Sequence, residues 1–188
     1  MLRKCRECGE IELEVVIDLG DQYLSDFRTD DLKPNKYPLK LLRCPKCHFV
    51  QLDESAPLSE MYTENYGFKS GVNNTIKADL KNIVEQAMSY LPEPPKIDYS
   101  DEVKERSVLD IGSNDGTLLS NYPKHWYKVG FDPITKLCIE AKQHASLIIN
   151  DFFSSSTASH LKQFDAITAI SMFYDVENPN DLVKAMKA

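Results

Sequence analysis

The strongest constraint on the fold is a repeated alternation of strand and helix patterns in the second half of the chain. Apolar, strand-forming runs are followed at regular spacing by stretches with helical periodicity. The predicted strands are 107–111, 127–131, 147–150 and 165–170, and the predicted helices are 116–122, 134–144, 157–161 and 179–187. This alternation is typical of right-handed crossovers and of a parallel sheet covered on both faces. We therefore predict an α/β, Rossmann-like fold for this half.

The predicted sheet is incomplete. Open sheets of this type usually carry about five to seven strands, whereas four precede the last predicted helix. We therefore expect the chain to be the N-terminal part of a longer protein. With 188 residues, 42% of them hydrophobic, it is long enough to form two units with buried cores.

The first fifty residues have a two-residue periodicity instead. Apolar residues alternate with mostly acidic ones from residue 10 to 20, and similar runs precede Cys44 and follow Cys47. This pattern predicts a half-exposed strand at 10–20 and two further strands around the second cysteine pair. The front of the chain is thus a small β module.

Four of the five cysteines form two C-x-x-C pairs, which are Cys5 with Cys8 and Cys44 with Cys47. Each pair can wrap a tight turn, so four thiolates can converge on one zinc ion in a closed, structural site. Gly9 supports this prediction, because a residue that adopts a positive φ lets backbone N–H groups turn toward the sulfurs. His48 has the equivalent place in the second turn and is expected to pack or cap rather than bind metal. Unligated core cysteines and a redox pair are the alternatives.

A helical pattern at residues 73–91 and a stretch rich in proline and charge at 91–105 divide the chain. Asn74 or Thr75 is expected to cap this helix. We predict a zinc-binding module at 1–60, a helical bridge at 61–96 and a truncated cofactor-binding domain at 97–188.

The stretch "VLDIGSNDGTLL", residues 108–119, indicates where a ligand binds. A strand that passes through a glycine loop into a helix places backbone N–H groups at the edge of the sheet where open α/β folds bind ligands. The fingerprint G-x-G-x-x-G is not met, because Ser113 and Asn114 follow Gly112, and no Gly-Lys-Ser/Thr sequence is present. We therefore predict a ligand without pyrophosphate.

Polar side chains follow the other predicted strands as well. Asp132, before Pro133, ends the second strand, where a carboxylate can accept both ribose hydroxyls. After the third strand, Asp151 can bond an exocyclic amine and Phe152 can cover adenine. Ser171 follows the fourth strand. Because parallel strands end at one edge, these residues predict a pocket for a nucleoside cofactor.

These motifs carry a resemblance to a known family. With the four-cysteine module and "YGFKSGVNNT", the stretches "VLDIGSNDGTLL", "GFDP" and "NDFF" resemble the sugar C-methyltransferases that have an N-terminal zinc-binding domain and a class I methyltransferase domain. The resemblance covers nearly all of the chain. It implies S-adenosylmethionine (SAM) as methyl donor and a nucleotide-linked 4-keto-deoxysugar as acceptor. In this family a base removes the proton alpha to the ketone, and the enolate carbon attacks the sulfonium methyl.

The resemblance also implies roles for single residues. Asp132 would bind the ribose, Asp151 and Phe152 the adenine, and Tyr66 would lie over the reacting methyl unless it merely packs beside Tyr62 and Phe68. The residues implied around the methionine end of SAM are Asp110, Gly112, Ser113, Asn114 and Gly116.

Two features depart from the family pattern. Asp175 stands where many relatives have a histidine, and the relatives continue into a C-terminal domain with sugar-nucleotide contacts and catalytic side chains. We expect this chain to bind SAM but not to turn over alone.

Composition limits the possible partners. The net charge of −7, with scattered lysines, offers no basic surface for nucleic acid. The longest apolar stretches are too short to span a bilayer and the start is not signal-like, so we expect a cytoplasmic protein without a membrane partner. Two other hypotheses stay open: a zinc-ribbon interaction module with a degenerate Rossmann-like scaffold, and a nicotinamide-linked enzyme.

Overall fold

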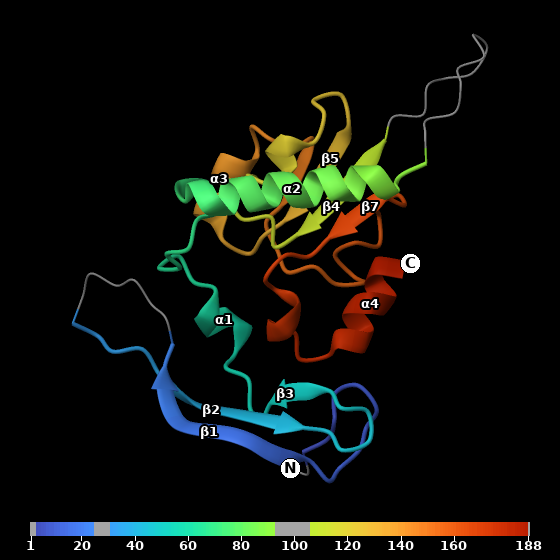
Figure 1. Cartoon of the computed structure of the whole chain (residues 1–188). Helices are drawn as coiled ribbons and strands as arrows, with labels where there is room; N and C mark the ends of the chain where they lie inside the picture. The colour runs from blue at the N-terminus through green and yellow to red at the C-terminus, as the bar shows by residue number, and fades with distance from the viewer. Residues whose placement is uncertain (1–2, 25–30, 93–105, 188) are drawn as a thin grey trace. The chain divides into compact units, whose positions relative to one another are not determined.

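The computed structural model describes residues 3–24, 31–92 and 106–187 (Figure 1). The chain forms two compact units, one of Met1–Gly67 with Ser171–Ala188 and the other of Phe68–Ile170. The predicted domain boundaries near residues 60 and 96 stay predictions, and most of the predicted connector at 91–105 lies outside the described residues.

The first unit is built on a three-stranded antiparallel sheet in the order β1-β2-β3. The strands are β1 (Glu14–Tyr23), β2 (Lys36–Arg43) and β3 (Val50–Leu52). Every residue of β1 is exposed, so the prediction of a half-buried face was wrong. Strand β1 is the edge strand of this sheet, and among the described residues both of its faces are left uncovered; two register shifts in the pairing with β2 also interrupt the alternation of faces.

Short helical elements complete this unit. They are α1 (Leu58–Met61), η3 (Phe173–Asp175) and α4 (Pro179–Lys187). Helix α4 begins at a proline, whose fixed φ suits the first helical position. The side chain of Asn178 accepts the N–H of Asp181 at 3.2 Å, and Leu182 and Ala185 are buried. The helix predicted at 179–187 is confirmed, with the same bounds.

The second unit contains a parallel four-stranded sheet in the order β6-β5-β4-β7. The strands are β4 (Ser107–Ile111), β5 (Tyr127–Phe131), β6 (Leu147–Ile149) and β7 (Ala166–Thr168). Strands β4 and β5 are central and nearly completely buried, as continuous apolar runs in parallel sheets usually are. The predicted fold class, a parallel α/β sheet preceded by a small β module, is confirmed.

The helices of this unit are α2 (Asn74–Tyr90) and α3 (Thr135–Ala141), with short 3₁₀ turns η1 (Ser70–Val72) and η2 (Leu119–Asn121). The cap of α2 is Asn73, not Asn74 or Thr75, and its side-chain oxygen accepts the N–H groups of Thr75 and Ile76. Figure 1 shows α2 crossing one face of the sheet. Leu80 and Val84 from α2 pack there with Val108, Leu119 and Trp126, and each such side chain contributes about 1.5–3 kcal/mol by burial.

Two predicted helices did not form. Residues 116–122 contain only η2, because Gly116 has φ +78° and Pro123 ends the segment after a few residues. Residues 157–160 form turns, since hydroxyl groups such as that of Thr157 bond to nearby backbone and compete with helix formation.

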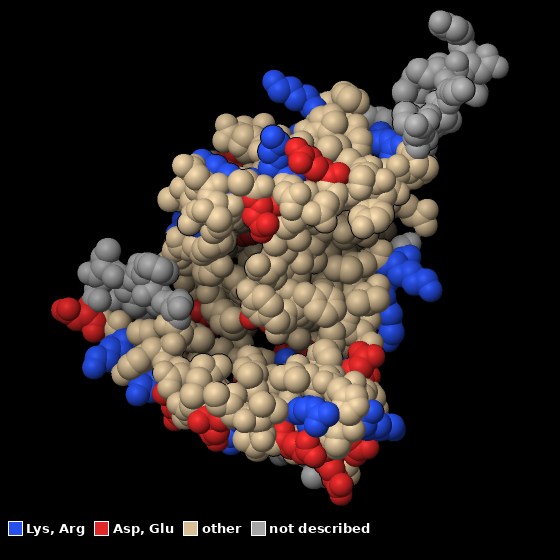
Figure 2. Space-filling view, in the orientation of Figure 1, with Lys and Arg blue, Asp and Glu red and all other residues tan. Residues whose placement is uncertain are grey.

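The face of the molecule in Figure 2 carries Lys and Arg scattered among Asp and Glu. Among the described residues, no helix is long and apolar enough to cross a membrane. The expectations on nucleic acid, membranes and localisation stay predictions.

Candidate functional site

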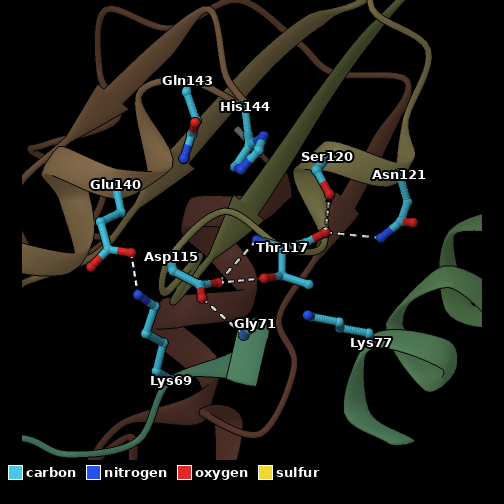
Figure 3. A pocket seen from close by; sticks show the side chains of 10 residues that line it. All are labelled: Lys69, Gly71, Lys77, Asp115, Thr117, Ser120, Asn121, Glu140, Gln143 and His144. Atoms are coloured by element: carbon cyan, nitrogen blue, oxygen red, sulfur yellow. Dashed lines mark hydrogen bonds and ion pairs between the residues drawn. The ribbon is translucent and has the colours of Figure 1, made fainter. Parts of the chain in front are cut away.

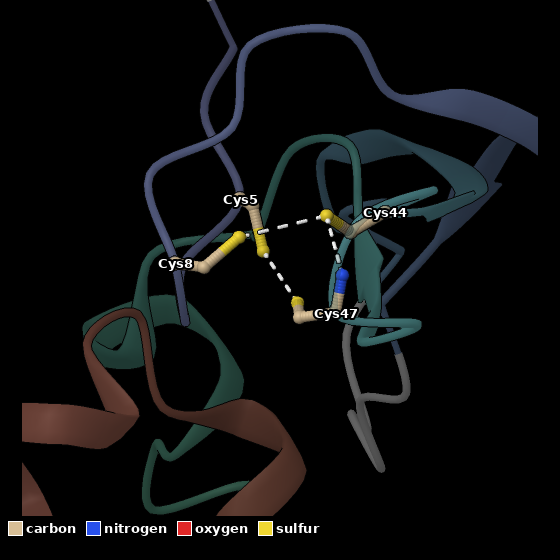
Figure 4. Close-up of side chains that lie close together, drawn as sticks. All are labelled: Cys5, Cys8, Cys44 and Cys47. Carbon is tan, nitrogen blue, oxygen red and sulfur yellow. Dashed lines mark hydrogen bonds between the residues drawn. The ribbon is translucent and has the colours of Figure 1, made fainter.

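The four paired cysteines converge in the first unit (Figure 4). Their sulfur atoms all lie within 4.8 Å of one another. The Sγ–Sγ distance is 3.5 Å between Cys5 and Cys47 and 3.6 Å between Cys8 and Cys44. Four thiolates about 2.3 Å from a tetrahedral zinc ion would have their sulfurs about 3.8 Å apart. The arrangement therefore fits zinc.

The two cysteine turns have the same backbone geometry. Gly9 donates its N–H to the carbonyl of Cys5 at 2.9 Å, and His48 donates to the carbonyl of Cys44 at 2.9 Å. Gly9 has φ +77° and His48 has φ +64°, so both occupy the left-handed region. The equivalence expected of these two residues is confirmed. His48 also contacts the guanidinium of Arg43 through Nδ1 at 2.7 Å, which is a packing role rather than metal binding.

The protonation of the thiols favours a metal ion. Burial acts to raise the pKa of Cys44, but N–H groups of Cys47 and Lys46 that point to its sulfur outweigh burial and lower the pKa to about 7. The N–H of Phe49 acts to lower the pKa of Cys47, but burial and the neighbouring sulfurs raise it to about 12. The four sulfurs thus oppose joint ionisation unless a cation lies between them.

The candidate cofactor site begins where β4 ends. The N–H groups of Gly112 and Ser113 both donate to the carbonyl of Phe131, at 2.9 and 2.8 Å, which ties the loop to the end of β5. Gly112, Asn114 and Gly116 have φ of +74°, +52° and +78°. A Cβ at Gly116 would lie 3.0 Å from Cα of Ala141, so glycine also permits the close approach of α3.

Asp132 is the central acceptor of this loop. Its Oδ2 accepts the N–H of Asn114 at 2.9 Å and its Oδ1 accepts the N–H of Ile134 at 2.9 Å. The side chain is 5% exposed, and burial raises its pKa although these two N–H groups oppose the shift. The carboxylate thus holds the loop after β4 against the start of α3. Pro133 follows it and is half-buried.

The residues before α2 hold the loop from another side. The Asn114 side chain accepts the N–H of Ser70 at 2.9 Å and donates to the carbonyl of Phe68 at 3.2 Å. The carboxylate of Asp115 accepts the N–H of Gly71 at 2.8 Å. The contribution of Asp115 and of this segment was not predicted, although the stretch "YGFKSGVNNT" was part of the resemblance and contains Phe68, Ser70 and Gly71.

Ser113 faces the sheet. Its side chain is 3% exposed and packs against Gly130, where an added Cβ would lie 2.6 Å from the Ser113 hydroxyl oxygen and 2.9 Å from its Cβ. The side chain of Ser113 therefore fills the space left by a glycine in β5, whereas its backbone belongs to the loop.

A polar hollow of about 360 Å³ lies beside the loop (Figure 3). Asp115 and Thr117 line it together with Lys77 from α2 and the ion pair of Lys69 with Glu140. Asp115 lines the hollow and also accepts the N–H of Gly71. The residues around the hollow are therefore among those that hold the loop in place.

The remaining predicted site residues occupy several places. Asp151 and Phe152 follow β6 and are exposed, and the Asp151 carboxylate accepts the N–H of Phe152 at 2.7 Å. Ser171 has φ +55° and belongs to the first unit, as does Tyr66, whose ring centroid lies 5.3 Å from that of Tyr62. Their predicted roles stay predictions.

Asp110 is a buried carboxyl group in the middle of the parallel sheet. Its side chain accepts the hydroxyl of Thr168 at 2.7 Å, and the residue is 3% exposed. Burial raises its pKa to about 7, the Thr168 hydroxyl opposes the shift, and the charge of Asp132 adds to it. Three carboxyl groups, those of Asp110, Asp115 and Asp132, thus surround the loop.

This pKa predicts a pH dependence of stability. The folded chain keeps the proton of Asp110 up to about pH 7, whereas unfolded aspartates ionise near pH 4. The contribution of Asp110 to the free energy of unfolding is therefore largest below pH 4 and falls as the pH rises to 7, by about 4 kcal/mol in total. Asp110→Asn removes this titration and can still accept the Thr168 hydroxyl. We expect the variant to gain about 3 kcal/mol relative to wild type between pH 5 and pH 8.

Urea denaturation at both pH values, followed by the fluorescence of Trp126, measures this gain. Trp126 is the single tryptophan and lies in the core of the second unit. Asp79→Asn, at an exposed position of α2, is the control and should show no such gain. A wild-type pH dependence that survives in Asp110→Asn would contradict the assignment.

The parallel sheet and the loop after β4 define an α/β domain that binds a nucleoside cofactor at one edge of its sheet. Comparison with known proteins gives the family. Residues 76–188 match the family model described as "Methyltransferase domain", and residues 5–62 match one described as "Putative zinc binding domain". The first model matches more than half of the chain, so this chain belongs to the methyltransferase-domain family and carries a zinc-binding domain in front.

Relatives agree with this family. Two proteins named "Ubiquinone biosynthesis O-methyltransferase", from Actinobacillus pleuropneumoniae serotype 7 (strain AP76) and serotype 5b (strain L20), are 29% and 28% identical to the chain over 114 residues. Each alignment covers 53% of this chain and 49% of the relative. The chain thus spans about half the length of the curated relatives it matches.

Solved structures of plantazolicin methyltransferase BpumL in complex with SAH are also similar. With a pentazolic desmethylPZN analog also bound, the TM-score is 0.43 at 20% identity, over 62% of this chain and 43% of that chain. For the complex with SAH alone the TM-score is 0.38 at 22% identity, over 60% and 46%. Structural similarity with TM-scores this low supports no conclusion about this chain by itself. The family match and the four-cysteine geometry confirm the two predicted cofactors, zinc and SAM.

Proposed function

We propose that this chain is the SAM-binding part of an enzyme that methylates a carbon atom of a nucleotide-linked keto-deoxysugar. The observation that supports it most is the loop after β4, whose backbone is held by Asp132 and by the segment before α2. The sugar acceptor rests on the resemblance of the four-cysteine module and of "IGSNDG" to the sugar C-methyltransferases.

The charge of the loop suits SAM. The molecule carries a sulfonium and an ammonium group against one carboxylate, so its net charge is positive. Asp115 and Asp132 supply negative charge around the loop, whereas Asp110 is neutral below about pH 7, and attraction between opposite charges is strong where water is excluded. A pyrophosphate would be repelled by the same carboxylates.

The proposed roles follow the sequence of loops at the edge of the sheet. The backbone of Gly112, Ser113 and Gly116 and the side chains of Asp110 and Asn114 would hold the methionine end, and Asp132 with Pro133 the ribose. Asp151 and Phe152 would hold the adenine, with Ser171 at the same edge. Tyr66 would shield the reacting methyl group. Bound SAM would supply this methyl group as the electrophile.

The methylated atom is a carbon in this proposal. A base must remove the proton alpha to the ketone, and positioning of the enolate carbon in line with the methyl then accounts for most of the acceleration. The names of the relatives favour a second candidate, in which an oxygen of a phenol-like acceptor is methylated.

Calorimetry of the zinc-loaded chain with SAM and with S-adenosylhomocysteine tests the cofactor site. We expect dissociation constants on the order of 10–100 µM, in the usual range for enzyme ligands. Asn114→Ala removes the side chain that joins the loop to Phe68 and Ser70, and it should weaken binding about tenfold or more. Asn121→Ala, a second amide that bonds to backbone within the same unit, is the matched control and should bind as wild type does.

Absence of heat with both ligands would contradict the cofactor site and favour the interaction-module hypothesis. The acceptor needs the full-length protein, methyl-labelled SAM and a panel of nucleotide-linked keto-sugars and phenols. Product NMR then distinguishes a new carbon-bound methyl from an oxygen-bound one, and methylation of phenols alone would overturn the sugar assignment.

A further inference from the structure

The first cysteine turn is hydrogen-bonded to the segment that follows the parallel sheet. The side-chain amide of Asn180 donates to the carbonyls of both Arg6 and Glu7, each at 3.2 Å. The guanidinium of Arg6 in turn donates to the carbonyl of Val176 at 3.4 Å. Arg6 and Glu7 are the two residues between the zinc-binding Cys5 and Cys8. The turn that holds the metal is thus also the surface on which helix α4 begins.

The same turn is fixed to β3 and the chain after it. The N–H of Arg6 donates to the side-chain oxygen of Gln51 at 2.8 Å, and the Gln51 amide donates to the carbonyl of Lys4 at 3.1 Å. The Arg6 guanidinium also donates to the hydroxyl of Ser55 at 2.8 Å. Gln51 is 8% exposed and the hydrogen bonds are partly buried, so this is a partly buried polar network whose geometry depends on the conformation of the turn.

Helix α4 is short. It has nine residues, of which Pro179, Leu182 and Ala185 are buried. A helix of this length is not stable in isolation and depends on its tertiary contacts. The hydrogen bonds from Asn180 to the cysteine turn therefore contribute to the stability of the helix, together with its buried apolar side chains.

We propose that zinc occupancy of the four-cysteine site controls the order of residues 176–187, with Arg6 and Asn180 as the positioning residues that transmit it. Zinc fixes the directions of the carbonyls of Arg6 and Glu7 by holding the cysteines on either side. Without the ion these carbonyls lose their fixed orientation, and α4 loses its anchor. This inference concerns the metal site and does not depend on which acceptor is methylated.

Hydrogen exchange measured by mass spectrometry on zinc-loaded and zinc-stripped chain tests the coupling. We expect peptides within 176–187 to exchange roughly tenfold faster after chelation under reducing conditions. Peptides from β4 and β5, which belong to the other unit, should keep their protection. Unchanged protection of 176–187 after loss of the metal would overturn the proposal.

Asn180→Ala separates this coupling from general unfolding of the first unit. Alanine has the higher helix propensity, so a loss of protection cannot come from the helix itself. In zinc-loaded protein with unchanged zinc content, we expect faster exchange in 176–187. Lys184→Ala, which removes an exposed ion pair of 3.2 Å with Asp181 on the same helix, is the matched control and should exchange as wild type does. If residues 176–187 keep wild-type protection in Asn180→Ala, the proposal that Asn180 couples the zinc site to this segment is refuted.

Discussion

Replacement of Cys44 by serine is expected to abolish stoichiometric zinc binding and to unfold the three-stranded sheet of the first unit. Cys44 is fully buried and directly follows β2, and its thiol has the pKa lowered to about 7. Structural zinc sites contribute about 10–16 kcal/mol of apparent binding free energy at neutral pH. The sheet has little else to hold it, because every residue of β1 is exposed. This is the largest effect that we expect from a single substitution.

Zinc content per chain and hydrogen exchange of β2 measure the result. Cys138→Ser is the matched control, since Cys138 is also a buried cysteine but lies in α3 of the second unit. The control should bind one zinc ion and keep the protection of β2. A Cys44→Ser chain with one tightly bound zinc and a protected β2 would contradict the four-thiolate site.

Replacement of Asp132 by alanine is expected to reduce both stability and SAM binding. The substitution leaves the N–H groups of Asn114 and Ile134 without their acceptor in a buried place. We expect the free energy of unfolding to fall by about 3 kcal/mol. Loss of the proposed ribose contact should weaken SAM binding about 100-fold, which is about 3 kcal/mol.

Asp132→Asn separates the two effects. Its amide oxygen can still accept one of the two N–H groups, so roughly half of the stability should return, whereas one of the two acceptors for the ribose is lost. Calorimetry with S-adenosylhomocysteine, at a temperature where circular dichroism shows both variants folded, measures affinity apart from folding. Asp79→Ala on the exposed face of α2 should behave as wild type does. Folded Asp132→Ala that binds with wild-type affinity would exclude the ribose role.

The sequence predicted those parts of the fold that depend on local pattern. The central strands β4 and β5 are apolar runs bounded by turn residues, and the paired cysteines have a spacing that few other sites need. The loop after β4 was recognised because Gly112 and Gly116 interrupt a strand-to-helix pattern. Each of these signals lies within about a dozen residues of sequence.

Contacts between distant segments could not be predicted in this way. The partners of Asn114 lie 44 and 46 residues earlier in the chain, and no spacing rule connects an amide to backbone groups so far away. Periodicity likewise gave no sign of the bulges in β1 or of the packing of Ser113 on Gly130. The hydrogen bond of 2.6 Å between Tyr62 and Asp175 joins residues 113 positions apart. Such contacts follow from the tertiary fold and not from local preference.

The discontinuous first unit has a consequence for vectorial synthesis. Arg6 and Val176 are 170 residues apart, and Arg6 and Asn180 are 174 apart. At about 5–20 residues per second, a ribosome needs on the order of 10–30 s to supply the second partner after the first. During this interval the contiguous segment Phe68–Ile170 is synthesised completely. The ribosome thus supplies every residue of the second unit before it supplies the last segment of the first.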